Sequence, residues 1–148
     1  MTMVKRGPYN DLKTDVIKRF WQHMIRRHRE EIRHGLPQPV GARWHALPEL
    51  DCCISLTTGI DFVRVFIRTM EGGKPVKLRE RLERWSEELS PVFLVPLRSP
   101  GESDKFFSNK LDLDMNDESN WNEAADFLWE TSQRYEDALE QTLGGAAA

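Results

Sequence analysis

A change of hydrophobic period near residue 35 constrains the fold of this chain more than any other feature. Before it, apolar residues recur at intervals of three and four, which predicts a long helix over roughly residues 9–34 with Asn10 or Asp11 as its N-cap. Gly35, followed by two prolines, ends that helix. Beyond this point the pattern becomes strand-like, so the chain must pack helices against a sheet.

Three short segments rich in β-branched and aromatic residues follow, and we predict them as strands at 42–47, 50–57 and 61–69. The third segment carries apolar residues on both faces, which is typical of a strand in the middle of a sheet. Its two faces hold Val63, Val65 and Ile67 on one side and Phe62, Arg64, Phe66 and Arg68 on the other.

The second half of the chain alternates between the two periods again. It is predicted to form a helix over 76–89 ended by Ser90 and Pro91, strands over 92–98 and 105–115, and a final helix over 119–143. Pro96 indicates an edge position or a bulge in its strand.

The resulting order, α-β-β-β-α-β-β-α, predicts an α+β fold. We expect a mainly antiparallel or mixed sheet of about five strands, with a long N-terminal helix, a middle helix and a long C-terminal helix that cover mainly one face. A chain of 148 residues fits a single domain, 1–148. Its ordered core is predicted over 9–143, with a tail at 144–148.

The net charge of −3 hides a marked asymmetry along the chain. Residues 5–34 hold nine Lys and Arg against four Asp and Glu, whereas residues 101–148 hold three against twelve. This pattern is compatible with a basic binding face, with an acidic face that repels nucleic acid, or with two ends that attract each other.

Residues 112–123, "DLDMNDESNWNE", place six side-chain oxygens at the ligand spacing of a calcium-binding EF-hand loop. These residues are Asp112, Asp114, Asn116, Glu118, Asn120 and Glu123. However, the segment before them alternates like a strand, and Asp117 stands where an EF-hand needs Gly. The sequence therefore predicts a strand-to-helix junction, in which Asp117, Ser119 or Asn120 caps the last helix, and no metal site.

Catalytic motifs are missing from the sequence, and no cofactor is expected. It contains neither the Glu-x-Lys motif of restriction-type nucleases nor a Gly-rich phosphate loop. His28 and His34 are six residues apart, which places them too far around a helix to chelate one ion. An enzyme alternative is a site near His45, Cys52, Cys53 and Asp61, although buried structural cysteines are the simpler interpretation. Adjacent reduced thiols are typical of a cytoplasmic protein.

Cations on the first helix form the candidate nucleic-acid site, with Arg26, Arg29 and Arg33 as its residues and Arg27 beside them. Arg79, Arg81 and Arg84 of the middle helix are candidates to join them. The alternative is a solvated amphipathic face, because glutamates at helical spacing can pair with these arginines.

Several segments resemble one known family. They are "RFWQHMI" (19–25), "WHAL" (44–47), "FVRVFIR" (62–68), "RLERWSEEL" (81–89), "DLDMNDESNW" (112–121) and "FLWETSQRYEDAL" (127–139). Over roughly residues 16–143 the chain resembles the bacterial Domain of Unknown Function 4268 family. That family occurs alone or C-terminal to restriction-endonuclease-like domains and has no established active site, so the resemblance assigns no residue a role.

Together these observations predict a non-enzymatic accessory or binding module in the bacterial cytoplasm, linked through the resemblance to nucleic-acid processing or defence. Its expected partner is a protein or a nucleic acid. No apolar run approaches the ~20 residues that span a bilayer, so no membrane is expected. The alternatives are the enzyme site above and a purely structural, homodimeric protein.

Overall fold

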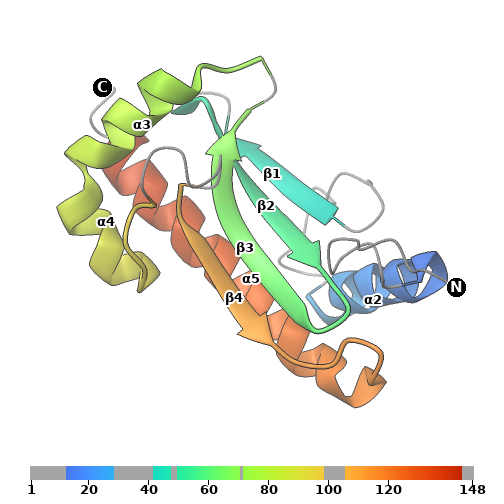
Figure 1. The fold of residues 1–148 in the computed structure, drawn as a ribbon. Coiled ribbons are helices and arrows are strands. Elements are labelled where there is room, and N and C mark those ends of the chain that lie inside the picture. The colour runs from blue at the N-terminus through green and yellow to red at the C-terminus, as the bar shows by residue number, and fades with distance from the viewer. Residues whose placement is uncertain (1–12, 29–41, 48–49, 71, 99–105, 145–148) are drawn as a thin grey trace, which may run out of the picture.

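The structure is a computed structural model that describes residues 13–28, 42–47, 50–70, 72–98 and 106–144 (Figure 1). In chain order its elements are α2 (Thr14–Arg27), β1 (Ala42–Leu47), β2 (Cys52–Thr58), β3 (Phe62–Thr69), α3 (Pro75–Arg84), α4 (Ser86–Phe93), β4 (Ser108–Asp112) and α5 (Trp121–Leu139). A 3-10 turn, Glu118–Asn120, precedes α5, and a π-helical turn, Glu140–Gly144, follows it. The α+β class is confirmed.

The sheet is an antiparallel meander. Within the described ranges it has four strands in the order β1-β2-β3-β4, rather than about five, and each pairs with the next along the chain. The predicted strands at 42–47, 50–57 and 61–69 are present within two residues of their expected ends. β3 lies between β2 and β4, as its apolar residues on both faces predicted.

The predicted strand over 92–98 and the predicted helix stop at Ser90 and Pro91 are both wrong. A second short helix, α4, follows a break at Trp85 and contains Pro91. Pro91 lacks the N–H that would bond to the carbonyl of Glu87, but both residues are exposed, so water can satisfy that carbonyl. The helix ends instead at Phe93, and its C-cap Leu94, which has a left-handed backbone (φ 63°), donates its N–H to the Ser90 carbonyl at 2.8 Å.

The apolar residues at the start of the predicted strand 92–98 instead anchor α4 in the core. Phe93 is fully buried and packs edge-on against Phe107, with ring centroids 4.9 Å apart, whereas Leu94 is 73% exposed. A run of apolar residues therefore marked one buried contact and not an alternating strand.

Two further elements are shorter than predicted. α2 begins after Lys13, which is extended, and ends at Arg27 with His28 as its C-cap, so the helix does not cover 9–34 as one unit. The residues at 9–12 and 29–34, including both expected N-caps, lie outside the described ranges. β4 is shorter than 105–115, although hydrogen bonds to β3 continue beyond its start, from Phe106 N to the Ile67 carbonyl and from Ile67 N to Phe107.

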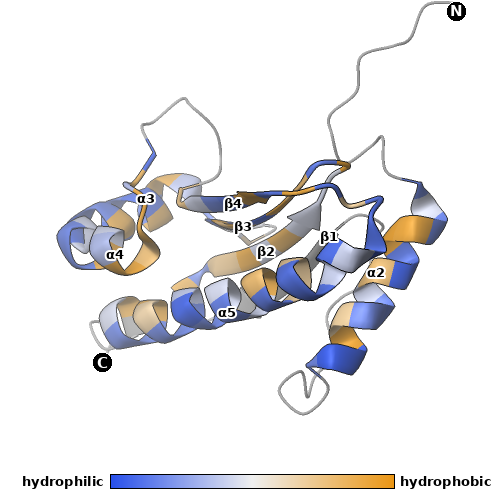
Figure 2. Cartoon of the chain, turned by 90° about the horizontal axis from the view of Figure 1, so that it is seen from below, coloured by the Kyte–Doolittle hydropathy of each residue, from blue (hydrophilic) through white to orange (hydrophobic). Residues whose placement is uncertain are grey.

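The helices cover one face of the sheet. Figure 2 shows α5 lying along that face with α2 beside it, while α3 and α4 lie at the other end of the molecule. The core fills the space between α5 and the sheet, where Ile54, Leu56, Val65, Ile67 and Leu128 are at most 1% exposed. None of the described helices combines the length and apolar character needed to cross a membrane.

A buried polar contact joins β4 to α5. Tyr135 of α5 is fully buried, and its hydroxyl group hydrogen-bonds to the Asn109 side-chain oxygen and lies 3.4 Å from the Val65 carbonyl. The Asn109 amide in turn donates to the Phe93 carbonyl at 3.0 Å. Because side chains alternate along a strand, turning Asn109 toward α5 turns Lys110 to the opposite face.

Candidate functional site

Cations of the basic first helix, α2, form ion pairs with acids of the last helix and of the turn that precedes it. Arg27 makes a two-pronged ion pair with Asp126, at 2.7 and 2.9 Å, and His28 Nε2 lies 2.9 Å from the same carboxylate. The hydrogen bond from Arg27 holds the pKa of Asp126 below its ordinary value. Arg19 pairs with Glu118 at 2.8 Å. Attraction between the two ends of the chain thus explains part of the charge asymmetry.

The predicted nucleic-acid residues on this helix are only partly placed. Arg26 is exposed and makes no ion pair within the described ranges, while Arg29 and Arg33 lie outside them. The arginines of the middle helix do not join this face, because α3 and α2 lie at opposite ends of the molecule (Figure 1). Arg81, for example, donates to the Leu50 carbonyl at 3.1 Å.

The residues of the enzyme alternative are not brought together. Cys52 and Cys53 are 0% and 2% exposed on opposite faces of β2, and burial raises the pKa of the Cys52 thiol to about 12. The backbone of His45 pairs with Ile54, one residue from Cys53. Asp61 follows the far end of β2, roughly 20 Å from the cysteines at ~3.3 Å per residue.

The stretch with calcium-like spacing forms the junction that the sequence predicted. Asp117 accepts hydrogen bonds from the backbone and hydroxyl of Ser119, and these hold its pKa below the ordinary value. The Asp114 side chain accepts from the Asn116 backbone at 2.9 Å. Across the described residues, no group of three or more His, Cys, Asp or Glu is arranged to hold a metal ion.

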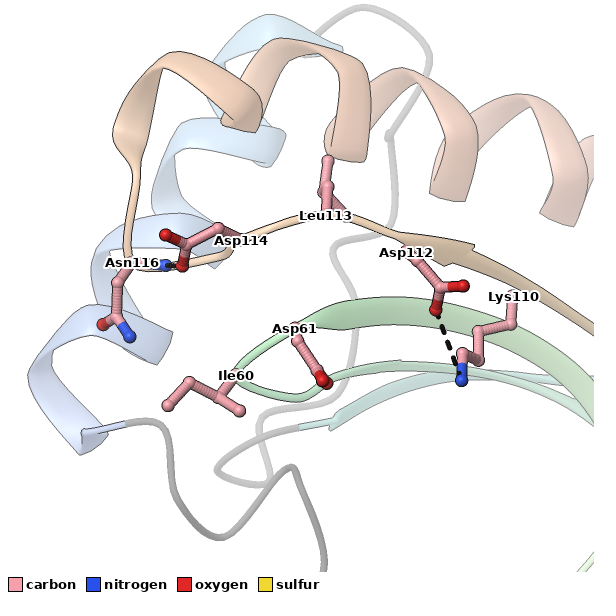
Figure 3. Close-up of a pocket in the computed structure, with 7 residues that line it drawn as sticks. All are labelled: Ile60, Asp61, Lys110, Asp112, Leu113, Asp114 and Asn116. Atoms are coloured by element: carbon pink, nitrogen blue, oxygen red, sulfur yellow. Dashed lines mark hydrogen bonds and ion pairs between the residues drawn. The ribbon is translucent and has the colours of Figure 1, made fainter.

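An open depression of about 750 Å³ lies where β4 runs into this junction. Its lining residues are Ile60, Asp61, Lys110, Asp112, Leu113, Asp114 and Asn116 (Figure 3). Figure 3 shows Asp112 directed toward Lys110, at 3.3 Å, and Asp114 turned back onto Asn116. The carboxylates of β4 and its following loop are therefore engaged with neighbouring groups of the chain itself.

Cations collect on the face of the sheet turned away from α5, which we call the distal face. Val63, Val65 and Ile67 join the core with α5, so the alternate residues of β3 point to the distal face. Those residues are Phe62, Arg64, Phe66 and Arg68. On β4, Lys110 stands directly opposite Arg64.

Arg64 and Lys110 share one aromatic ring. The Arg64 guanidinium carbon lies 5.0 Å from the centroid of the Phe62 ring, and the Lys110 ammonium nitrogen lies 5.3 Å from it. A cation over an aromatic face is attracted to the ring, whereas like charges directly opposite on two strands repel each other. The ring therefore offsets part of the cost of placing two cations side by side.

The surroundings of Arg64 also disfavour its charged form. Its Nε is buried and has no hydrogen-bond partner in the part of the chain that the structure describes. Burial lowers the pKa of Arg64, the positive charge of Arg98 lowers it further, and Asp112 opposes both effects. Arg68, by contrast, donates to the Ser55 hydroxyl at 2.7 Å.

The sequence indicated only some of the cations of the distal face. Alternation along 62–68 places Arg64 and Arg68 on one side of their strand, which the pattern alone indicated. The proximity of Lys110 to Arg64 depends on the pairing of β3 with β4, and Lys110 is more than 30 positions away along the chain.

The fold and the distal face define the chain as an α+β protein whose antiparallel meander is covered by helices on one side and carries cations on the other. No protein-family model, no curated protein and no solved structure matches it. The resemblance to the Domain of Unknown Function 4268 family remains a prediction.

Proposed function

We propose that this protein is a non-enzymatic binding module whose partner is a nucleic acid. The observation that carries the proposal is the charge of the distal face. Arg64 stands opposite Lys110 there, the positive charge of Arg98 lowers the pKa of Arg64, and Asp112 is a carboxylate that acts on both Arg64 and Lys110. A polyanion laid on this face would relieve the repulsion among the cations, and charge neutralisation of that kind drives most nucleic-acid binding.

The division of charge in the fold supports the same proposal. The exposed acids Glu123, Glu130 and Asp137 lie on α5, which packs on the other side of the sheet (Figure 2). These acids disfavour a nucleic acid along α5, whereas the cations of the distal face favour one there. The separation of charge thus orients the encounter even though the net charge of the chain is −3.

The chemistry of the thiols favours binding over catalysis. A cysteine nucleophile reacts as the thiolate, and a thiol buried with its pKa raised to about 12 is protonated at neutral pH. The carboxylate proposed to help it stands at the other end of the β2–β3 hairpin. These residues therefore support a packed core and not a reaction centre.

Binding of a fluorescent 20-nucleotide single strand and of its duplex, measured at ~50 and ~200 mM salt, tests the proposal. Three phosphate contacts predict that affinity falls ~20–40-fold between these salt concentrations, since the slope is about −0.7 to −0.9 per contact. Size-exclusion chromatography of the free chain is run in parallel to identify a homodimer. Undetectable binding at the lower salt, or affinity that does not respond to salt, would refute the proposal.

A further inference from the structure

The outer edge of β4 carries unpaired backbone groups. β4 pairs with β3 on one side, and no other strand of the described ranges pairs with it on the other side (Figure 1). The bonds that Phe107 and Leu113 make toward β3 and the turn before it show that the odd-numbered residues of this segment face β3. Because bonded and non-bonded positions alternate along an antiparallel pair, the N–H and C=O groups of Ser108, Lys110 and Asp112 point away from β3. Such an edge is a template for a further strand.

The outer edge is open along the length of β4. Arg98 donates its backbone N–H to the Phe106 carbonyl just before β4 begins, but no described backbone group bonds to the outer edge within β4 itself. The side chains of Lys110 and Asp112 are 44% and 78% exposed. The open depression borders the end of the strand (Figure 3). The backbone of β4 is therefore available to a partner strand.

Exposed apolar side chains lie near the start of the same strand. Val92 and Leu94 are 41% and 73% exposed. They flank Phe93, whose carbonyl accepts a hydrogen bond from the Asn109 side chain of β4. Burial of this apolar area against a second protein surface would be favourable. The edge thus combines free backbone groups with apolar area beside it.

The charges of β4 favour one antiparallel pairing of this strand with a second copy of itself. Lys110 and Asp112 project from the same face of β4, two positions apart. A twofold axis at Leu111 places Lys110 of each copy opposite Asp112 of the other, which gives two cross-strand ion pairs. The symmetric registers on either side place Lys110 opposite Lys110, or Asp112 opposite Asp112, and like charges in that position repel. A lysine on a sheet edge commonly prevents pairing, but in this register it meets a carboxylate.

We propose that a second copy of this chain binds along the outer edge of β4, so that two four-stranded sheets join into one across a twofold axis at Leu111. The proposal goes beyond the proposed function and does not depend on it. Within one copy Lys110 and Asp112 pair at 3.3 Å. An ion pair between exposed side chains contributes little to stability, so each side chain can turn to the opposite residue of the second copy.

Charge reversal tests this pairing without removing a buried group. The dissociation constant of the dimer is measured by light scattering over a range of protein concentrations. Lys110→Glu and Asp112→Lys each put like charges opposite each other at both cross-strand pairs, so each should raise the dissociation constant about tenfold or more. The matched control, Arg26→Glu, reverses the charge of an exposed residue of α2 and should leave the constant unchanged.

The two reversals should complement each other. In an equimolar mixture, the acidic edge of Lys110→Glu faces the basic edge of Asp112→Lys, so a heterodimer should form about as tightly as the unchanged dimer. The double variant Lys110→Asp, Asp112→Lys restores opposite charges within one chain and should also dimerise like the unchanged protein. Thermal melting shows whether each variant is folded. If a single reversal unfolds the chain, the double variant decides the test.

Three results would overturn the proposal. The first is an unchanged protein that stays monomeric up to ~100 µM, because the edge charges then protect β4 from pairing. The second is a dimer whose dissociation constant does not respond to either reversal, because the copies then meet at another surface. The third is a mixture of the two variants, or a double variant, that fails to recover the affinity of the unchanged protein.

Discussion

Removing one hydroxyl group, by Tyr135→Phe, should destabilise the protein measurably without disturbing the distal face. The hydroxyl group bonds to the Asn109 side-chain oxygen, and the ring packs on Phe93 with centroids 4.4 Å apart. Phenylalanine keeps the ring contact and loses the hydrogen bond, so Asn109 is left with an oxygen that has no protein donor. Burial raises the pKa of Tyr135 well above its usual range, so the hydroxyl group is neutral at any working pH.

The size of the effect follows from the burial of the two partners. A lost hydrogen bond costs about 1 kcal/mol, and a stranded buried acceptor costs about 1–3 kcal/mol in all. Asn109 is only half-buried, so water replaces part of the loss, and we expect about 1–2 kcal/mol in the free energy of unfolding. With an unfolding entropy of ~2.1 cal/mol/K per residue, this lowers the melting temperature by roughly 3–6 °C for a chain of 148 residues.

Urea titration and thermal melting, followed by circular dichroism, measure this change for Tyr135→Phe alone and in an Asn109→Ala background. Because the interaction is shared, Tyr135→Phe should cost much less once Asn109 is gone. Equal costs in both backgrounds, or no cost in either, would refute the contact between α5 and β4. Oligonucleotide affinity serves as the control and should not change, since Tyr135 lies on the helical side of the sheet.

Two other predictions concern ionisable groups away from the distal face. Burial raises the pKa of Cys52 to about 12, so this thiol should react with a thiol reagent at pH 8 only when the protein unfolds. Denaturant should therefore accelerate labelling by orders of magnitude. Rapid labelling of the native protein would contradict the burial of Cys52. Asp126→Asn should lower stability at pH 7, because Arg27 favours the ionised form of Asp126 and lowers its pKa on folding. That stabilisation is present above the ordinary pKa of about 4 and is lost as pH falls through the lower folded pKa. Urea titrations at pH 7 and pH 3 measure it. The stability difference between the variant and the unchanged protein should be smaller at pH 3.

Much of the fold could be predicted from local pattern. The three strands of the first half have ends within two residues of those expected, because β-branched residues and short turns mark them clearly. A capped start to the last helix near Asp117 was also expected, since acids and an Asx-type cap are local signals, although Asp117 caps the 3-10 turn that leads into α5 and not α5 itself. The strand predicted at 92–98 is wrong because Pro91 does not stop the helix, since an exposed position in a short helix tolerates proline.

The candidate site was less predictable for a physical reason. Clusters of charge along the chain point to the arginines of the first helix. Arg27 of that cluster is paired with Asp126, a residue 99 positions away. The cations of the distal face come instead from two strands, and no local pattern shows that Arg64 and Lys110 stand opposite each other. Tertiary pairing therefore decides which of these charges are neutralised within the chain.

The contacts between α2 and α5 also bear on the order in which the chain folds. Each strand of the meander pairs with its neighbour in sequence, so the sheet closes mostly short loops. The ion pairs between the two helices join residues 98 or 99 positions apart, and closing so long a loop is entropically costly until the sheet exists. Docking of the first helix is therefore expected late, after the folding barrier, so that weakening these pairs hastens unfolding while leaving the folding rate almost unchanged.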